Sequence, residues 1–182
     1  MTAAVAFTAC SAPSPASDSK SRGSLPTIAT AATSNALIAP TATAGSSDTQ
    51  PAINAYLGMW QDFVTAGRTS DWQSPLLADH ATGDALLQMS RGLYADHYNG
   101  LITRGAPVDN PVVKSATPAA DPTTVIITDC GDSSLFLKYY ASTGQLAPEG
   151  AGGRQAITAE ALKTAGGTWK IDRFAVEDVG TC

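Results

Sequence analysis

The order of two periodicities constrains the fold of this chain more than any other feature. Between Pro51 and Asn99 apolar residues recur with helical spacing, and after Gly100 they form short extended segments separated by Pro, Gly and Asp. One helix is predicted from Pro51 to about Gly67, because its apolar side chains follow the offsets 0, 3, 4, 7, 10 and 11: Ile53, Tyr56, Leu57, Trp60, Phe63 and Val64. A second helical region runs from about Pro75 to Asn99, with a break expected at residues 81–83, since glycine weakens a helix by about 1 kcal/mol relative to alanine.

The segments after Gly100 predict antiparallel strands joined by turns. In the last of them, Trp169 and Ile171 share one face, whereas Phe174 and Val176 have the opposite parity, so we expect a bulge near Asp172-Arg173. Helices followed by strands predict an α+β fold, in which N-terminal helices pack on one face of a curved antiparallel sheet. The predicted strands are Leu101 to Arg104, Val112 to Thr117, Thr123 to Cys130, Leu135 to Tyr140, Arg154 to Lys163 and Thr168 to Val179.

Charge and composition narrow the class of protein. The 182 residues carry a net charge of −5, whereas a protein that neutralises phosphates has an excess of Lys and Arg, so nucleic-acid binding is not expected. In residues 11–50, Ser, Ala, Thr and Pro fill 28 of 40 positions, and such a segment has too little bulky apolar surface to offset its ordering entropy. We therefore predict a disordered tether over residues 11–50 and a folded domain over residues 51–182.

The first ten residues contain one motif of interest. They are small or apolar, carry no charged side chain and end in Phe7-Thr8-Ala9-Cys10. This pattern, followed by a polar linker, resembles the end of a bacterial lipoprotein signal peptide, so residues 1–10 are interpreted as a truncated signal-like segment. The resemblance implies lipidation of Cys10, and two or more acyl chains there give stable anchoring. We accordingly expect an extracytoplasmic protein held at the cell membrane; an incidental cysteine in a disordered terminus is the alternative.

The cysteine count bears on the same location. With Cys10 used for lipid, Cys130 and Cys182 remain as one pair, which suits an oxidising compartment. We predict a disulfide between them; two unrelated buried thiols are the alternative. No Cys-x-x-Cys or Cys-x-x-His spacing occurs, so no metal site is predicted at these cysteines.

Six segments of residues 52–182 carry a family resemblance: Asp71-Trp72, Pro75 to Ala78, Ala81 to Leu86, Gly100 to Gly105, Asp129 to Ser134 and Val179 to Cys182. Together they resemble the cone-shaped nuclear transport factor 2-like (SnoaL-like) superfamily, and also small secreted actinobacterial lipoproteins with that fold. The resemblance implies helices packed on a curved antiparallel sheet, but the superfamily includes isomerases, dehydratases, transport factors and subunits of assemblies.

Enzymes of the resembled fold use an open cavity between the long helix and the sheet, with an Asp and His acid–base pair inside. His97 and Asp129 are the catalytic candidates on this basis, because His97 follows Leu86 by eleven residues and so lies near the apolar stripe of its helix. A structural histidine at the rim and a rigid Asp-rich turn are the alternatives. The residues expected to line a ligand cavity are Tyr56, Trp60, Tyr94, His97 and Tyr139.

Two further groupings have both a functional and a structural interpretation. His80 and Asp84 are four residues apart and pair if both lie on one helix. Asp129 and Asp132 lie on either side of Gly131 in the sequence, and a functional interpretation makes them a carboxylate pair or an oxygen-rich cation site. We favour the structural interpretation, a turn held by Asx hydrogen bonds.

With two histidines and no catalytic motif, the sequence favours a binding or interaction module over an enzyme. The alternatives are a SnoaL-like isomerase or dehydratase acting on a small apolar substrate, and a structural subunit of a cell-envelope or secretion assembly. We expect no cofactor. The expected partners are a small apolar ligand or an envelope protein, with a homodimer as the expected form of self-association.

Overall fold

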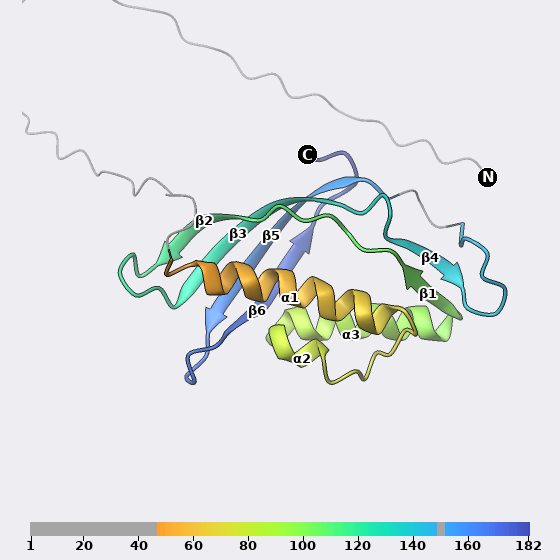
Figure 1. Cartoon of the computed structure of the whole chain (residues 1–182), viewed down its shortest axis with the longest axis horizontal. Coiled ribbons are helices and arrows are strands. Elements are labelled where there is room, and N and C mark those ends of the chain that lie inside the picture. The colour runs from red at the N-terminus through yellow and green to blue at the C-terminus, as the bar shows by residue number, and fades with distance from the viewer. Residues whose placement is uncertain (1–46, 149–151) are drawn as a thin grey trace, which may run out of the picture. The chain divides into compact units, whose positions relative to one another are not determined.

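The computed structural model describes residues 47–148 and 152–182 of the chain (Figure 1). The predicted signal-like segment, its Cys10 and the tether up to residue 46 lie outside the described residues. At the end of the predicted tether, Thr49 is already buried and Gln50 begins the first helix.

Three helices precede all the strands, as predicted. Helix α1 spans Gln50–Gly67, α2 spans Leu77–His80 and α3 spans Gly83–Tyr98. The predicted break falls between α2 and α3, where Ala81 is extended and Gly83 has a φ of +50°. Gly83 also lies close to strand β6 (Trp169–Val176), since a Cβ there would be 2.3 Å from Oδ1 of Asp172. A side chain at this position would therefore strain the backbone and disturb the packing of α3 on the sheet.

The strands form two antiparallel sheets. In the larger sheet the order is β2-β3-β5-β6, and β1 pairs with β4 in a second, two-stranded sheet. In the β5–β6 ladder Glu160 faces Arg173 and Ala161 faces Ile171, so Asp172 is the extra residue and the predicted bulge is confirmed. The strands are β1 Leu101–Arg104, β2 Val112–Thr117, β3 Thr124–Asp132, β4 Leu137–Tyr140, β5 Arg154–Lys163 and β6 Trp169–Val176.

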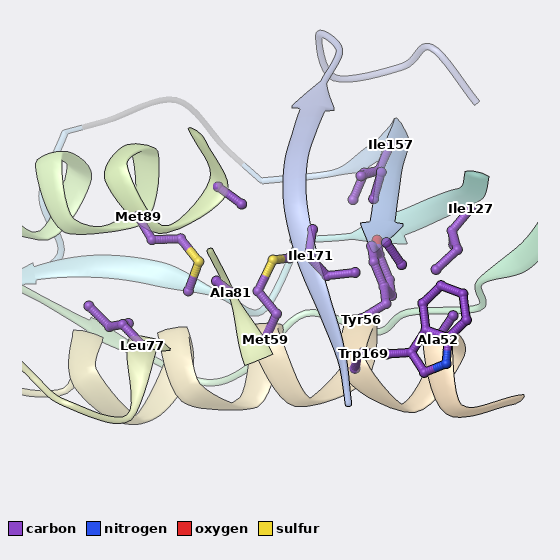
Figure 2. Packing of buried hydrophobic residues seen from close by; sticks show 14 of the residues in the cluster. Ala52, Tyr56, Met59, Leu77, Ala81, Met89, Ile127, Ile157, Trp169 and Ile171 are labelled. Atoms are coloured by element: carbon purple, nitrogen blue, oxygen red, sulfur yellow. The ribbon is translucent and has the colours of Figure 1, made fainter. Parts of the chain in front are cut away.

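The core lies between the helices and one face of the four-stranded sheet. Side chains of α1, including Met59 and Tyr56, point toward Ile127, Ile157 and Ile171 of the strands (Figure 2). In β3 the buried positions alternate along the strand, so that one of its faces is covered by the helices and the other is not. Leu57 of the predicted apolar stripe is an exception, because 40% of its surface is exposed.

The chain ends in a segment that is tied back to the sheet. Beyond β6, the N–H groups of Glu177 and Gly180 donate to the carbonyls of Ala156 and Arg154, each at a distance of 2.9 Å or less. Cys182 then reaches Cys130 of β3, with a Cα–Cα distance of 5.8 Å, and the predicted disulfide is confirmed. Within residues 47–148 and 152–182, no helix combines the length and the apolar character needed to cross a membrane.

Candidate functional site

A buried hydrogen bond joins α1 to β3 in the interior of the domain. Asp129 lies on the core face of β3, in phase with Val125 and Ile127, and only 7% of its surface is exposed. The hydroxyl of Tyr56 donates to Oδ2 of Asp129 at 3.1 Å, and the backbone N–H of Asn110 donates to Oδ1 at 2.8 Å. Both carboxylate oxygens of Asp129 are thus hydrogen-bonded, which compensates for the burial of the group.

Asp109 adds a second carboxyl to this group, and the sequence analysis missed it. The loop between β1 and β2 carries it to β3, where Val108 forms a bridge with Asp132. The pKa of Asp109 is raised to about 6, mainly by burial and to a smaller extent by the negative charge of Asp129 and a hydrogen bond between the two carboxyls. Its Oδ1 atom is buried and has no hydrogen-bond partner among the described residues. The Asp109 carboxyl is therefore protonated in mildly acidic solution.

Tyr56 remains a neutral phenol over the whole physiological range. Burial raises its pKa far above the ordinary value, and although the Trp60 indole lowers it, the charges of Asp129 and Asp109 raise it further. We call Tyr56, Asp109 and Asp129 the acid cluster. Chemically it offers a fixed hydroxyl donor and a carboxyl that exchanges a proton near pH 6, which are the elements of general acid–base chemistry.

A row of aromatic rings fills the interior next to the acid cluster. Trp60 meets Tyr56 edge-on at a centroid distance of 6.3 Å, Phe63 at 6.1 Å and Phe174 at 5.6 Å. Phe63 in turn meets Phe136, which directly precedes β4, at 6.1 Å. This aromatic row therefore runs from the acid cluster to the end of the domain where β4 lies, and its edge-to-face contacts are favourable for such rings.

The structure does not bring the other predicted cavity residues to this place. Tyr94 lies on the exposed side of α3 and packs edge-on against Trp72 at 5.3 Å. Tyr139 lies on β4, and the guanidinium of Arg104 covers its ring at 4.6 Å. Of the five expected cavity residues, only Tyr56 and Trp60 are neighbours in the interior.

The placement of His97 contradicts the expectation that it serves as a cavity-lining base. It lies on α3 and is exposed, and within the described residues its imidazole takes part in no side-chain hydrogen bond or ion pair; its backbone carbonyl accepts from the N–H of Gly100. The buried positions of α3 are Ala85, Met89, Leu93 and Asp96, so the apolar stripe passes beside His97 rather than through it. An exposed histidine without a carboxylate partner is not part of an acid–base pair.

The other two groupings are also resolved. Nδ1 of His80 lies 2.7 Å from Oδ2 of Asp62 on α1, so its partner is not Asp84; the break between α2 and α3 places His80 and Asp84 on different helices. Asp132 accepts a hydrogen bond from the backbone N–H of Ser134 at 2.9 Å, so the predicted Asx turn forms at Asp132, whereas Asp129 lies within strand β3 and not in a turn. No three His, Cys, Asp or Glu side chains of the described ranges are grouped to hold a metal ion.

The sequence gives little indication that Asp109 belongs to the acid cluster. It lies in Pro107-Val108-Asp109-Asn110-Pro111, which is typical of a loop and carries no helical or strand periodicity. Only the pairing of Val108 with Asp132 and the close approach allowed by Gly131 bring it to Asp129; a Cβ at Gly131 would lie 3.4 Å from Oδ1 of Asp109.

Comparisons with known proteins give similarity in structure only. No protein-family model matches the chain. A comparison with curated proteins also finds no match. The chain is similar to the solved structure of the intermembrane space region of the chloroplast protein ARC6, with 16% identity, a TM-score of 0.48 and coverage of 73% of this chain and 98% of that one. It is also similar to a ketosteroid isomerase-like protein from Erwinia carotovora atroseptica, with 11% identity, a TM-score of 0.43 and coverage of 72% and 96%.

The predicted fold class is confirmed. N-terminal helices cover one face of a curved antiparallel sheet, which is the α+β arrangement that the sequence predicts. The fold hosts both catalytic and non-catalytic proteins, so function has to be argued from the residues of this chain.

Proposed function

We propose that this protein is a membrane-anchored extracytoplasmic lipoprotein whose folded domain acts as a binding or interaction module. The observation that carries the proposal is the filled interior. Tyr56 has no exposed surface, Asp129 is nearly as deeply buried, and the aromatic row occupies the space beside them. A catalytic group has to touch its substrate, and the protein's own side chains cover Tyr56 and Asp129, while Asp109 at the edge of the acid cluster is only partly buried.

The hollows on the described surface also favour a binding module over an enzyme. Five hollows of the described part of the chain have volumes between about 220 and 790 Å³, and none of them is lined by Tyr56, Trp60, Asp109 or Asp129. The largest is lined mainly by apolar side chains. Such a surface suits the capture of a ligand or partner more than the conversion of a substrate.

A SnoaL-like isomerase or dehydratase is the second candidate, and the acid cluster is the observation in its favour. A carboxyl that exchanges its proton near neutral pH beside a fixed tyrosine hydroxyl is a general acid–base arrangement. A small apolar substrate would reach Tyr56 and Asp129 only if the rings of Trp60 and Phe63, both on α1, turned away from their present neighbours. This motion would break edge-to-face contacts with Tyr56, Phe174 and Phe136.

The test that separates the two functions is an isomerisation assay on β,γ-unsaturated ketones, in which conjugation of the product is followed by absorbance. We expect no turnover above the buffer rate. Turnover that falls about a hundredfold or more in Asp129→Asn, with an unchanged melting temperature, would establish the enzyme instead, since that is the usual size of an acid–base contribution. Asp132→Asn is the matched control, because this carboxyl lies in the same strand but outside the acid cluster.

The anchoring part of the proposal is supported by the cysteines. One pair forms a disulfide, as is usual outside the cytoplasm, and Cys10 follows the signal-like segment. We expect the full chain, produced from its own gene, to appear in the membrane fraction and to incorporate labelled fatty acid. Cys10→Ser should abolish the labelling, whereas Cys182→Ser should leave it intact. Labelling that persists in Cys10→Ser would refute lipidation at this residue.

A further inference from the structure

The most voluminous of the five hollows described above lies between the two sheets. It is bounded by β4, by the adjoining ends of β3 and β5 and by the segment after β6, and it has a volume of about 790 Å³. This volume falls within the about 300–1,000 Å³ that small-molecule sites usually have. Its apolar lining includes Phe136, Leu137, Leu146, Ala147 and Val179.

Two of the lining residues are apolar and yet largely exposed to water. The exposed fraction of Leu146 is 56% and that of Val179 is 55%. They approach the hollow from different parts of the chain, one from the loop after β4 and the other from the segment that the disulfide holds in place. Phe136 forms the inner wall, because its ring also packs against Phe63 of α1. A ligand here would cover apolar surface that the folded chain leaves in water.

The polar side chains that line the hollow already have partners within the protein. The Ser133 hydroxyl is within 2.9 Å of Oε1 of Gln155 and 3.1 Å of the Gly153 carbonyl. Nε2 of Gln155 donates to the Glu177 carbonyl at 2.9 Å. The Lys138 ammonium forms an ion pair with Asp96 at 2.7 Å. A charged ligand would have to compete with these internal contacts, whereas an uncharged apolar one would leave them in place.

The backbone beside the hollow is paired as well. The N–H of Ala147 donates to the Lys138 carbonyl, that of Phe136 to Ser133 and that of Ser133 to Gly153, at 2.9 to 3.0 Å. Peptides that bind by strand addition depend on unpaired N–H and C=O groups at a sheet edge. The hollow is therefore better suited to a small molecule than to an extended peptide.

We propose that this hollow binds an uncharged, largely aliphatic molecule. The inference rests on the proposed function as a binding module and names its site and ligand class. The ligand lies against Phe136 and Leu137 on one side and is covered by Leu146 and Val179 on the other. The acid cluster takes no part in this binding, since the rings of Phe136 and Phe63 come between the hollow and Trp60.

The probe for the test is N-phenyl-1-naphthylamine, an uncharged apolar dye whose fluorescence rises on transfer from water. Leu146→Asp should weaken its binding about tenfold or more, because burial of a leucine side chain contributes about 1.5–3 kcal/mol and 1.4 kcal/mol is a factor of ten. Leu135→Asp is the matched control: this leucine is 73% exposed in the preceding loop and does not line the hollow. The dissociation constant of the dye for Leu135→Asp should stay within about twofold of its value for the unmodified protein, as expected for a surface change outside the site.

A second measurement uses competition and mapping. At neutral pH, 1-decanol should displace the dye at a lower concentration than decanoate does, and backbone amide resonances of Leu137 and Gln155 should shift more than those of α3. Absence of dye binding, equal weakening by both leucine variants, or shifts confined to the helices would overturn the site. Stronger displacement by decanoate would overturn the ligand class. None of these outcomes involves ketone turnover, so a failure here is distinct from a failure of the proposed non-catalytic function.

Discussion

Substitution of Asp109 by asparagine should stabilise the protein at neutral pH and leave it unchanged in acid. The folded-state pKa of Asp109 is about 6, against 3.8 for the ordinary group. The stabilisation that protonated Asp109 contributes is therefore fully present below pH 3.8 and is lost as the pH rises through about 6. If the whole pKa shift of Asp109 counted, its ionisation would lower the free energy of unfolding by about 3 kcal/mol at neutral pH. Because this carboxyl is only partly buried, solvent screening reduces the loss to about 1–2 kcal/mol. Asparagine is neutral throughout and still donates to Asp129.

The assay is guanidinium denaturation of both proteins, with the disulfide intact, at several pH values from about 4 to about 7. The free energy of unfolding of Asp109→Asn should exceed that of the original by about 1–2 kcal/mol at pH 7, with a difference near zero at pH 4. Asp132→Asn is the control with the opposite sign, since hydrogen bonds from Ser134 lower the pKa of Asp132 and stabilise its charged form. It should lower stability at pH 7, and this difference should vanish as the pH falls. A variant at position 109 that is less stable than the original at pH 7 would refute the reasoning.

Three further results are expected from equilibrium unfolding of single variants. Tyr56→Phe should cost about 1.5–3 kcal/mol, because it removes a hydrogen bond to the buried Asp129; an unchanged midpoint would contradict that role. Cys130→Ser should cost about 4 kcal/mol, as expected for a cross-link whose ends are 52 residues apart, and reduction of the original protein should give the same loss. Gly92→Ala on the open face of α3 should stabilise by about 0.5–1 kcal/mol, whereas Gly105→Ala should destabilise, because φ is +82° and the new Cβ would lie 1.8 Å from the Leu135 carbonyl oxygen. Equal effects of the two glycine substitutions would contradict this account.

The sequence by itself determined the local elements. The spacing of apolar residues predicted α1, and Gly83 marked the break between α2 and α3. The change of parity between Ile171 and Phe174 predicted the bulge that leaves Asp172 without a partner in β5. All of these depend on residues within a few positions of one another, because helical and strand periods and turn chemistry are properties of short segments. The disulfide also followed from the sequence, because counting left one pair of cysteines.

Tertiary structure decided the site. Tyr56 and Asp129 are 73 positions apart, and they meet only because α1 packs on the core face of β3. Asp109 joins them from a loop without periodicity, through the bridge between Val108 and Asp132. For His97 the local pattern gave a wrong prediction. It lies in helical phase with Leu86 and was expected in a cavity, but Leu86 itself is only partly buried, at the flank of the helix. Successive helix positions are about 100° apart, so the buried stripe is fixed by what α3 packs against. Which acids meet, and which remain in water, thus depends on how the helices are seated on the sheet, which no local pattern specifies.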